Sequence, residues 1–163
     1  MTQQVEEQDP YQEGPKGIVG WTLLPVIGLF LTPIYLVFYF ITTFFLINSS
    51  EWEEITTPGG QGYHSLFMPS IYLEIGFNAL FMVFCIYLIV LLFQKKKLFP
   101  KLIIIYYIVS VVADIIITVL VNQINTSYNV DPTSVNLIGI ISSVIWIQYF
   151  RKSKRVKNTF VNE

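Results

Sequence analysis

Two acidic residues stand inside long apolar stretches of this sequence. Glu74 lies within residues 66–93 and Asp114 within residues 102–121, and neither stretch holds another Asp, Glu, Lys, Arg or His. Placing an aspartate at the centre of a membrane helix costs about 2.5–3.5 kcal/mol on insertion scales, so such a residue marks a functional site by default. The two carboxyl groups therefore define a candidate site inside a membrane.

Uncharged polar residues flank both acids at intervals of four, the spacing that shares one face of an α-helix. The two polar stripes are Ser70, Glu74 and Asn78 in one helix, and Ser110, Asp114, Thr118 and Asn122 in the next. The turn over 94–101 is short and carries Pro100 at the start of the second helix, which makes the two helices antiparallel neighbours. At about 1.5 Å per residue, Asp114 lies level with Asn78, so the stripes form a polar seam in the outer half of the membrane.

The seam has two interpretations. Polar side chains can hold membrane helices together through hydrogen bonds of about 0.6 kcal/mol each, or border a notch filled with water. Alternatively, the carboxyl groups hold a proton, a cation or a small solute, because no Lys or Arg lies within the bilayer to neutralise them. The sequence leaves both open, and the structural interpretation is the more common one.

Four apolar stretches must position these residues. Hydrophobic residues make up 53% of the chain and charged residues 13%, and the mean hydropathy is +0.58. Crossing a hydrocarbon core of about 30 Å takes roughly 20 apolar helical residues, and none of the stretches has the charged face of a soluble helix. We therefore predict an all-α integral membrane bundle of four transmembrane helices, with spans at about 24–47, 68–93, 100–121 and 133–150.

The cations predict the orientation of the bundle. None of the ten Lys and Arg residues lies in the loops 48–65 and 122–133, and the positive-inside rule places cation-rich short loops in the cytoplasm. Both termini are then cytoplasmic, with an acidic tail over 1–16 that we expect to be disordered, a transmembrane domain over 17–150 and a basic tail over 151–163. The cations expected to set this topology and to contact anionic lipid headgroups are Lys95, Lys96, Lys97, Lys101, Arg151, Lys152, Lys154, Arg155 and Lys157.

The basic tail has an order that topology alone does not require. In "SKRVKNTF", residues 153–160, the Ser, Val, Thr and Phe residues add no charge. This pattern predicts a short segment that lies on the membrane surface or docks beside the 94–101 turn. Nucleic acid is not an expected partner, because the net charge is −1 and phospholipid headgroups lie at hand.

The segments outside the membrane lack the motifs of an enzyme. They hold no nucleophile elbow, P-loop, zinc spacing or dinucleotide fingerprint. His64 stands near three Glu residues in a glycine-containing loop but without the spacing of metal ligands. We therefore expect no enzymatic activity, no metal and no cofactor, and we expect Cys85 to pack as a small hydrophobic residue.

Three stretches carry a resemblance: "GIVGWTLLPVIGL" from residue 17, "FQKKKLFPK" from residue 93 and "IWIQYFRKSKRVKNTFV" from residue 145. They resemble the YdgK-like family of small bacterial membrane proteins, which is classed as a domain of unknown function. That family typically has a proline where this chain has Gln148. The resemblance implies a four-helix protein of the bacterial inner membrane, and it supplies no reaction, substrate or catalytic residue.

These features favour a non-enzymatic protein that binds or regulates a partner in the membrane, either another membrane protein or a second copy of the chain. The alternative is a small transporter or channel component that uses Glu74 and Asp114 as a proton, cation or solute site. Four helices are few for alternating access, and the two halves of the sequence show no obvious repeat. Transport would therefore require oligomerisation.

Overall fold

The computed structural model describes residues 14–163, so most of the predicted acidic tail over 1–16 lies outside the described residues. Every helix and strand assignment in this part of the chain is helical, apart from one isolated β-bridge. The elements are η1 (Gly20–Thr22), α1 (Leu23–Ile47), α2 (Ser50–Thr56), α3 (Phe67–Phe93), α4 (Phe99–Ser127), α5 (Leu137–Lys152) and α6 (Lys154–Thr159). The all-α prediction is confirmed.

Three helices are long and apolar enough to cross a membrane: Gly20–Ile47, Phe67–Phe93 and Phe99–Ser127. Their outward faces expose large apolar side chains such as Phe38 and Leu80, which are 63% and 70% exposed. Apolar surface of this extent is not tolerated in water but is compatible with lipid. The fold is therefore compatible with a membrane protein. α5 has 16 residues, or about 24 Å, which is shorter than the other three.

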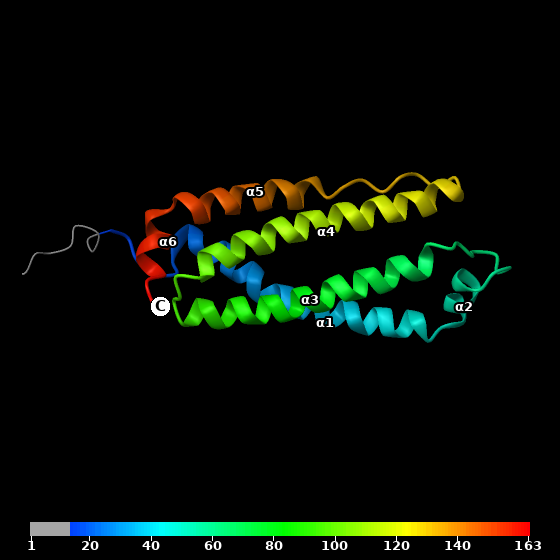
Figure 1. The fold of residues 1–163 in the computed structure, drawn as a ribbon, viewed down its shortest axis with the longest axis horizontal. Helices are drawn as coiled ribbons and strands as arrows, with labels where there is room; N and C mark the ends of the chain where they lie inside the picture. The colour runs from blue at the N-terminus through cyan, green and yellow to red at the C-terminus, as the bar shows by residue number, and fades with distance from the viewer. Residues whose placement is uncertain (1–13) are drawn as a thin grey trace, which may run out of the picture.

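The long helices pack in the order α1, α3, α4, α5, each against the next. Figure 1 shows them running lengthwise, with α2 at one end of the bundle and α6 at the other. We refer to these as the α2 end and the α6 end. α3 and α4 lie on either side of the 94–101 turn and pack against each other in antiparallel directions. Their polar stripes can therefore approach each other.

Cys85 does more than fill space between α1 and α3. Pro33 lies inside α1 and has no N–H, so the carbonyl of Leu29, four residues earlier, loses its helical partner. The thiol of Cys85, fully buried on α3, donates to this Leu29 oxygen at 3.1 Å. A cysteine is a weak donor, but in an apolar interior it satisfies an oxygen that would otherwise have no partner.

The chain returns from α4 to α5 through a non-helical segment, residues 129–136, which runs beside the last turns of α4 (Figure 1). The side chain of Asn122 fastens it: Nδ2 donates to Thr133 O at 3.0 Å, and Thr133 N donates to Asn122 Oδ1 at 2.7 Å. Asn136 then caps α5 by accepting from Gly139 N at 2.9 Å. The helix therefore begins at Leu137, four residues after the start of the span predicted at 133–150.

The end of the chain is packed into the bundle. The ring of Phe99 is fully buried; it stacks on Phe160 with centroids 4.6 Å apart and meets Phe150 edge-on at 5.9 Å. Val156 is buried beside them. Of the two placements predicted for residues 153–160, the structure therefore shows docking beside the 94–101 turn.

Hydrogen bonds complete this arrangement, which we call the tail junction: residues 14–22, 94–101 and 149–163. Thr159 Oγ1 accepts from Gly17 N at 2.8 Å, and Arg155 Nη1 donates to Val19 O at 2.5 Å. Gly20, at φ +61°, leaves room for that guanidinium, since an added Cβ would lie 3.0 Å from it. The uncharged residues of the tail therefore pack the tail against the bundle. The three stretches that carry the family resemblance meet at the α6 end.

Candidate functional site

A cavity of about 260 Å³ lies between α1, α3 and α4 and brings the two acids together. Glu74 and Asn78 of α3 line it opposite Ser110 and Asp114 of α4. Both acids are half-buried. We call this the acid cavity. Aromatic rings form much of the rest of its wall: Tyr35, Phe77, Phe81 and Tyr106.

The acid cavity includes four of the seven residues of the predicted polar stripes. The other three lie elsewhere. Ser70 is buried, and its Oγ has no hydrogen-bond partner within residues 14–163. Thr118 is buried outside the lining of the cavity, and Asn122 binds the backbone of Thr133.

Two further cavities adjoin this one. A cavity of about 300 Å³ between α1, α4 and α5 shares Thr32, Tyr106 and Ser110 with the acid cavity. Another, of about 240 Å³ between α4 and α5, shares Ser110 and Asp114 and adds Asn136 at the start of α5. Ser110 therefore borders all three cavities. No pattern in the sequence indicated that α1 and α5 contribute to this site.

The two carboxyl groups are unpaired in the part of the chain that the structure describes. Among the hydrogen bonds and ion pairs of residues 14–163, none involves the side chain of Glu74 or Asp114, and the one ion pair in this part of the chain joins Lys97 to Glu163 at the α6 end. Ser110, between them, donates to Tyr107 O of its own helix at 2.9 Å. The acids are therefore free to bind a ligand or water.

The non-helical segment approaches the level of Asp114. Asp114 lies about 22 Å along α4 from Phe99, and Asn122 about 35 Å along it. Residues 133–136 run between these two levels, because Thr133 binds Asn122 and Asn136 shares a cavity with Asp114. Within a membrane, non-helical backbone is tolerated where it is buried in protein or lines a cavity filled with water. Residues 129–134 are exposed, and Asn136 lines the cavity that it shares with Asp114.

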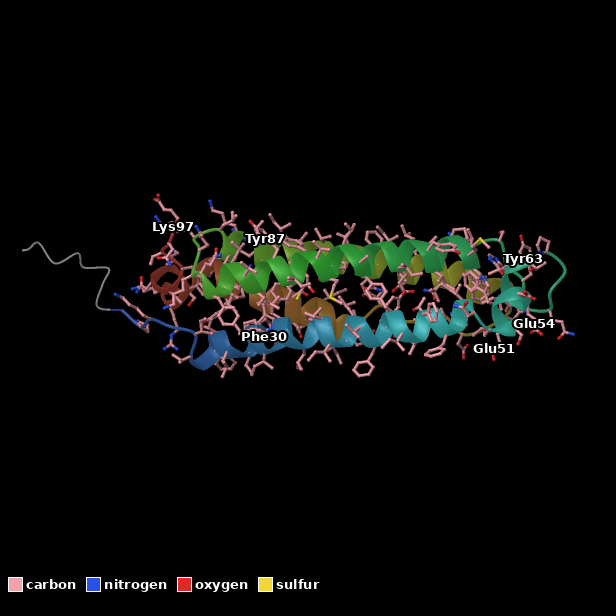
Figure 2. All side chains as sticks on the ribbon, turned by 90° about the horizontal axis from the view of Figure 1, so that it is seen from below. Phe30, Glu51, Glu54, Tyr63, Tyr87 and Lys97 are labelled. Atoms are coloured by element: carbon pink, nitrogen blue, oxygen red, sulfur yellow. The ribbon has the colours of Figure 1, made fainter. Side chains whose placement is uncertain are left out.

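The described part of the chain holds no group of three or more His, Cys, Asp or Glu residues placed to bind a metal ion. His64 instead connects the two loops at the α2 end: its Nδ1 accepts from Leu66 N and its Nε2 lies 3.1 Å from Ser127 Oγ. Tyr128 Oη donates to Tyr63 O nearby. Figure 2 shows Tyr63 at this end with Glu51 and Glu54, far from Lys97.

The fold and the site together define a class: an all-helical chain with three helices able to span a membrane and a polar cavity between them. Residues 15–161 match a family described as "Protein of unknown function (DUF2569)", and the chain belongs to this family. Neither the curated proteins nor the solved structures include a match to this chain. The family match covers the acid cavity and all of the tail junction except residues 14, 162 and 163.

Proposed function

We propose that this chain is a non-enzymatic membrane protein that binds a small organic cation, an amine or a quaternary ammonium group, at Glu74 and Asp114. One observation carries the proposal: acids from two different helices line one cavity, and neither has a hydrogen-bond or ion-pair partner within residues 14–163. A bound cation supplies the missing charge, and an isolated carboxylate in an apolar interior is otherwise costly.

The lining favours an organic cation over a metal ion. Aromatic faces such as those of Phe81 and Tyr106 attract ammonium groups, and this attraction grows when water is excluded. A cavity of about 260 Å³ is close to the lower limit for small-molecule sites. A metal ion would need a closer set of oxygen ligands than two carboxyl groups and neutral side chains supply.

The alternative, that the polar stripes only hold the helices together, requires hydrogen bonds between them. Within residues 14–163, neither acid makes such a bond. The side-chain bonds between elements involve other residues, such as Cys85 with Leu29 between α1 and α3, and several lie toward the two ends of the bundle. Examples are Thr22 with Tyr149 at 2.6 Å and His64 with Ser127 at 3.1 Å. The acid cavity lies between these ends, so its polar groups support binding more than adhesion.

For the topology, we propose four crossings, with both termini in the cytoplasm and the bacterial inner membrane as the location. Residues 129–136 and α5 together form the fourth crossing. In support, every Lys and Arg of the described chain lies at the α6 end, and the loops 48–66 and 128–136 at the α2 end have none. The α6 end then faces the cytoplasm and its anionic headgroups.

Binding can be measured by titrating tetramethylammonium into the full-length protein in phosphatidylcholine nanodiscs, with isothermal titration calorimetry. We expect Glu74→Gln and Asp114→Asn each to weaken binding by about tenfold or more, since an interaction with a charged group contributes roughly 1.5–3 kcal/mol.

The matched control is Glu53→Gln, the same chemical change at an exposed position of α2. It should leave the affinity unchanged. No measurable binding by the wild type, or equal binding by the wild type and both cavity variants, would exclude the proposal.

A further inference from the structure

A separate cavity lies away from the acids at the α6 end, lined by the last turns of α3 and the 94–101 turn. Its volume is about 540 Å³, which is ample for a small ligand. Lys96, Lys97 and Lys101 contribute its basic side, and Tyr87 and Val90 on the last turns of α3 contribute an apolar wall. Figure 2 shows Tyr87 and Lys97 on the same side of the bundle, toward the α6 end. We call this the lysine cavity.

The end of the chain holds the lysines in place. Lys97 N donates to Asn162 O at 2.8 Å, and Asn162 N donates to Lys95 O at 3.1 Å. The side chain of Asn162 adds a bond to Gln94 O at 2.7 Å. The turn, in which Lys95 has φ +50°, is therefore fixed by the tail, and the lysine cavity is a formed site instead of a loop with scattered charges.

We propose that the lysine cavity binds one anionic phospholipid. The phosphate lies between Lys97 and Lys101, and an acyl chain runs along the apolar wall of Tyr87 and Val90. Both wall residues are more than two-fifths exposed on the lipid-facing surface, directly below the charged rim. This is the order of groups in a phospholipid, with charge at the interface and hydrocarbon beneath it. The inference does not depend on the acid cavity.

Glu163 is the acidic residue that lines the lysine cavity, and its side chain does not block access to the lysines. Its Oε1 lies 3.3 Å from Lys97 Nζ, but the two side chains are 92% and 59% exposed. An ion pair that exposed contributes little, so a phosphate can displace it. Lys96 Nζ donates to the backbone oxygen of Glu163. The side-chain carboxylate of Glu163 is therefore the group that a phosphate would displace from Lys97.

The chain contains its own control. Lys152 and Lys154 lie at the same end of the bundle and are as exposed as Lys97 and Lys101, but they do not line the lysine cavity. A diffuse attraction to an anionic leaflet would depend equally on either pair. A formed site depends on the cavity pair only.

The test is titration of phosphatidylglycerol against the full-length protein in a neutral detergent, with bound lipids counted by native mass spectrometry. We expect one phosphatidylglycerol per chain on the wild type. We expect Lys97→Ala with Lys101→Ala to weaken it roughly thirtyfold, since each lysine near an anionic headgroup contributes a factor of about five. The variant Lys152→Ala with Lys154→Ala should keep wild-type affinity, and Glu163→Gln should bind more tightly.

Equal losses in the two double variants would show a diffuse attraction and overturn the proposal, as would full retention after Lys97→Ala with Lys101→Ala. A competition experiment with inorganic phosphate tests whether the ligand is a phospholipid or a free phosphate. If it competes with phosphatidylglycerol at similar concentration, the ligand is a free phosphate and the phospholipid assignment is wrong. Thermal unfolding of each variant, followed by circular dichroism, verifies that the folded bundle is being compared.

Discussion

The tail junction and the acid cavity differ in how their polar groups are satisfied. At the tail junction, Thr22 pairs with Tyr149, and Thr159 accepts from Gly17 N while donating to Arg155 O. Around the acid cavity, the carboxyl groups have no partner within the described residues, although both are half-buried. The polar groups of one region are paired within the described chain, and the two carboxyl groups of the other are not.

This difference indicates where stability resides. A buried polar group without a partner costs about 1–3 kcal/mol, so a chain can retain several of them only if other regions offset the cost. The aromatic stack of Phe99, Phe150 and Phe160 provides such a region, with side chains that are almost fully buried. We infer that the tail junction holds the helices in place while the acid cavity stays open to ligand.

The largest effect should come from the centre of the tail junction. Phe99→Ala removes a fully buried ring from between Phe150 and Phe160, and we expect the free energy of unfolding to fall by about 3–5 kcal/mol. Chemical unfolding in detergent micelles, followed by circular dichroism, measures the change.

Phe38→Ala is the matched control, because the same ring is removed from a lipid-facing position that is 63% exposed. Its effect should stay below about 0.5 kcal/mol. If the two variants lose similar amounts of stability, the tail junction is not the stable region and the comparison with the acid cavity fails.

A smaller effect should follow from one hydroxyl group. Thr159→Val keeps the shape of a buried side chain but removes the oxygen that accepts from Gly17 N, so we expect a loss of about 1–2 kcal/mol. Hydrogen exchange at the Gly17 amide should speed up as well. Thr42→Val is the control: its hydroxyl bonds only to Tyr39 O on an exposed face, and we expect little change. Unchanged exchange at Gly17 in Thr159→Val would show that this bond does not hold the N-terminal segment.

Local pattern was enough to predict the centre of the acid cavity. The four-residue spacing and the short turn predicted a seam that contains Glu74 and Ser110, with Asp114 level with Asn78, and these four residues line the cavity. The residues at the ends of the stripes do not line the cavity, because a helix has 3.6 residues per turn and positions spaced by four gradually rotate around it. Over the interval from Ser110 to Asn122 the drift reaches about 120°, which turns Asn122 away from α3 and toward Thr133.

The contacts that sequence could not predict join distant segments. The pairing of Cys85 with the Leu29 carbonyl depends on the packing of α1 against α3, and the stacking of Phe160 on Phe99 depends on where the tail returns. Hydropathy also predicted one span over residues 133–150, although residues 133–136 are not helical and α5 begins at Leu137. A window of apolar residues does not reveal that the side chain of Asn122 binds the backbone of Thr133 just before this helix begins.

The smallest effect on stability should come from the acids themselves, and it separates the two regions most directly. Glu74→Gln with Asp114→Asn keeps the volume of both side chains and removes both charges from groups that have no hydrogen-bond partner in residues 14–163. In the absence of ligand, we therefore expect no loss in the free energy of unfolding and a gain of less than about 0.5 kcal/mol, since both groups are only half-buried. Thr159→Val, which removes only one hydroxyl, should cost more than this double change. If the double variant instead loses about 1 kcal/mol or more, as two lost interhelical hydrogen bonds of about 0.6 kcal/mol each would give, then the acids hold the helices together and the acid cavity is a structural seam.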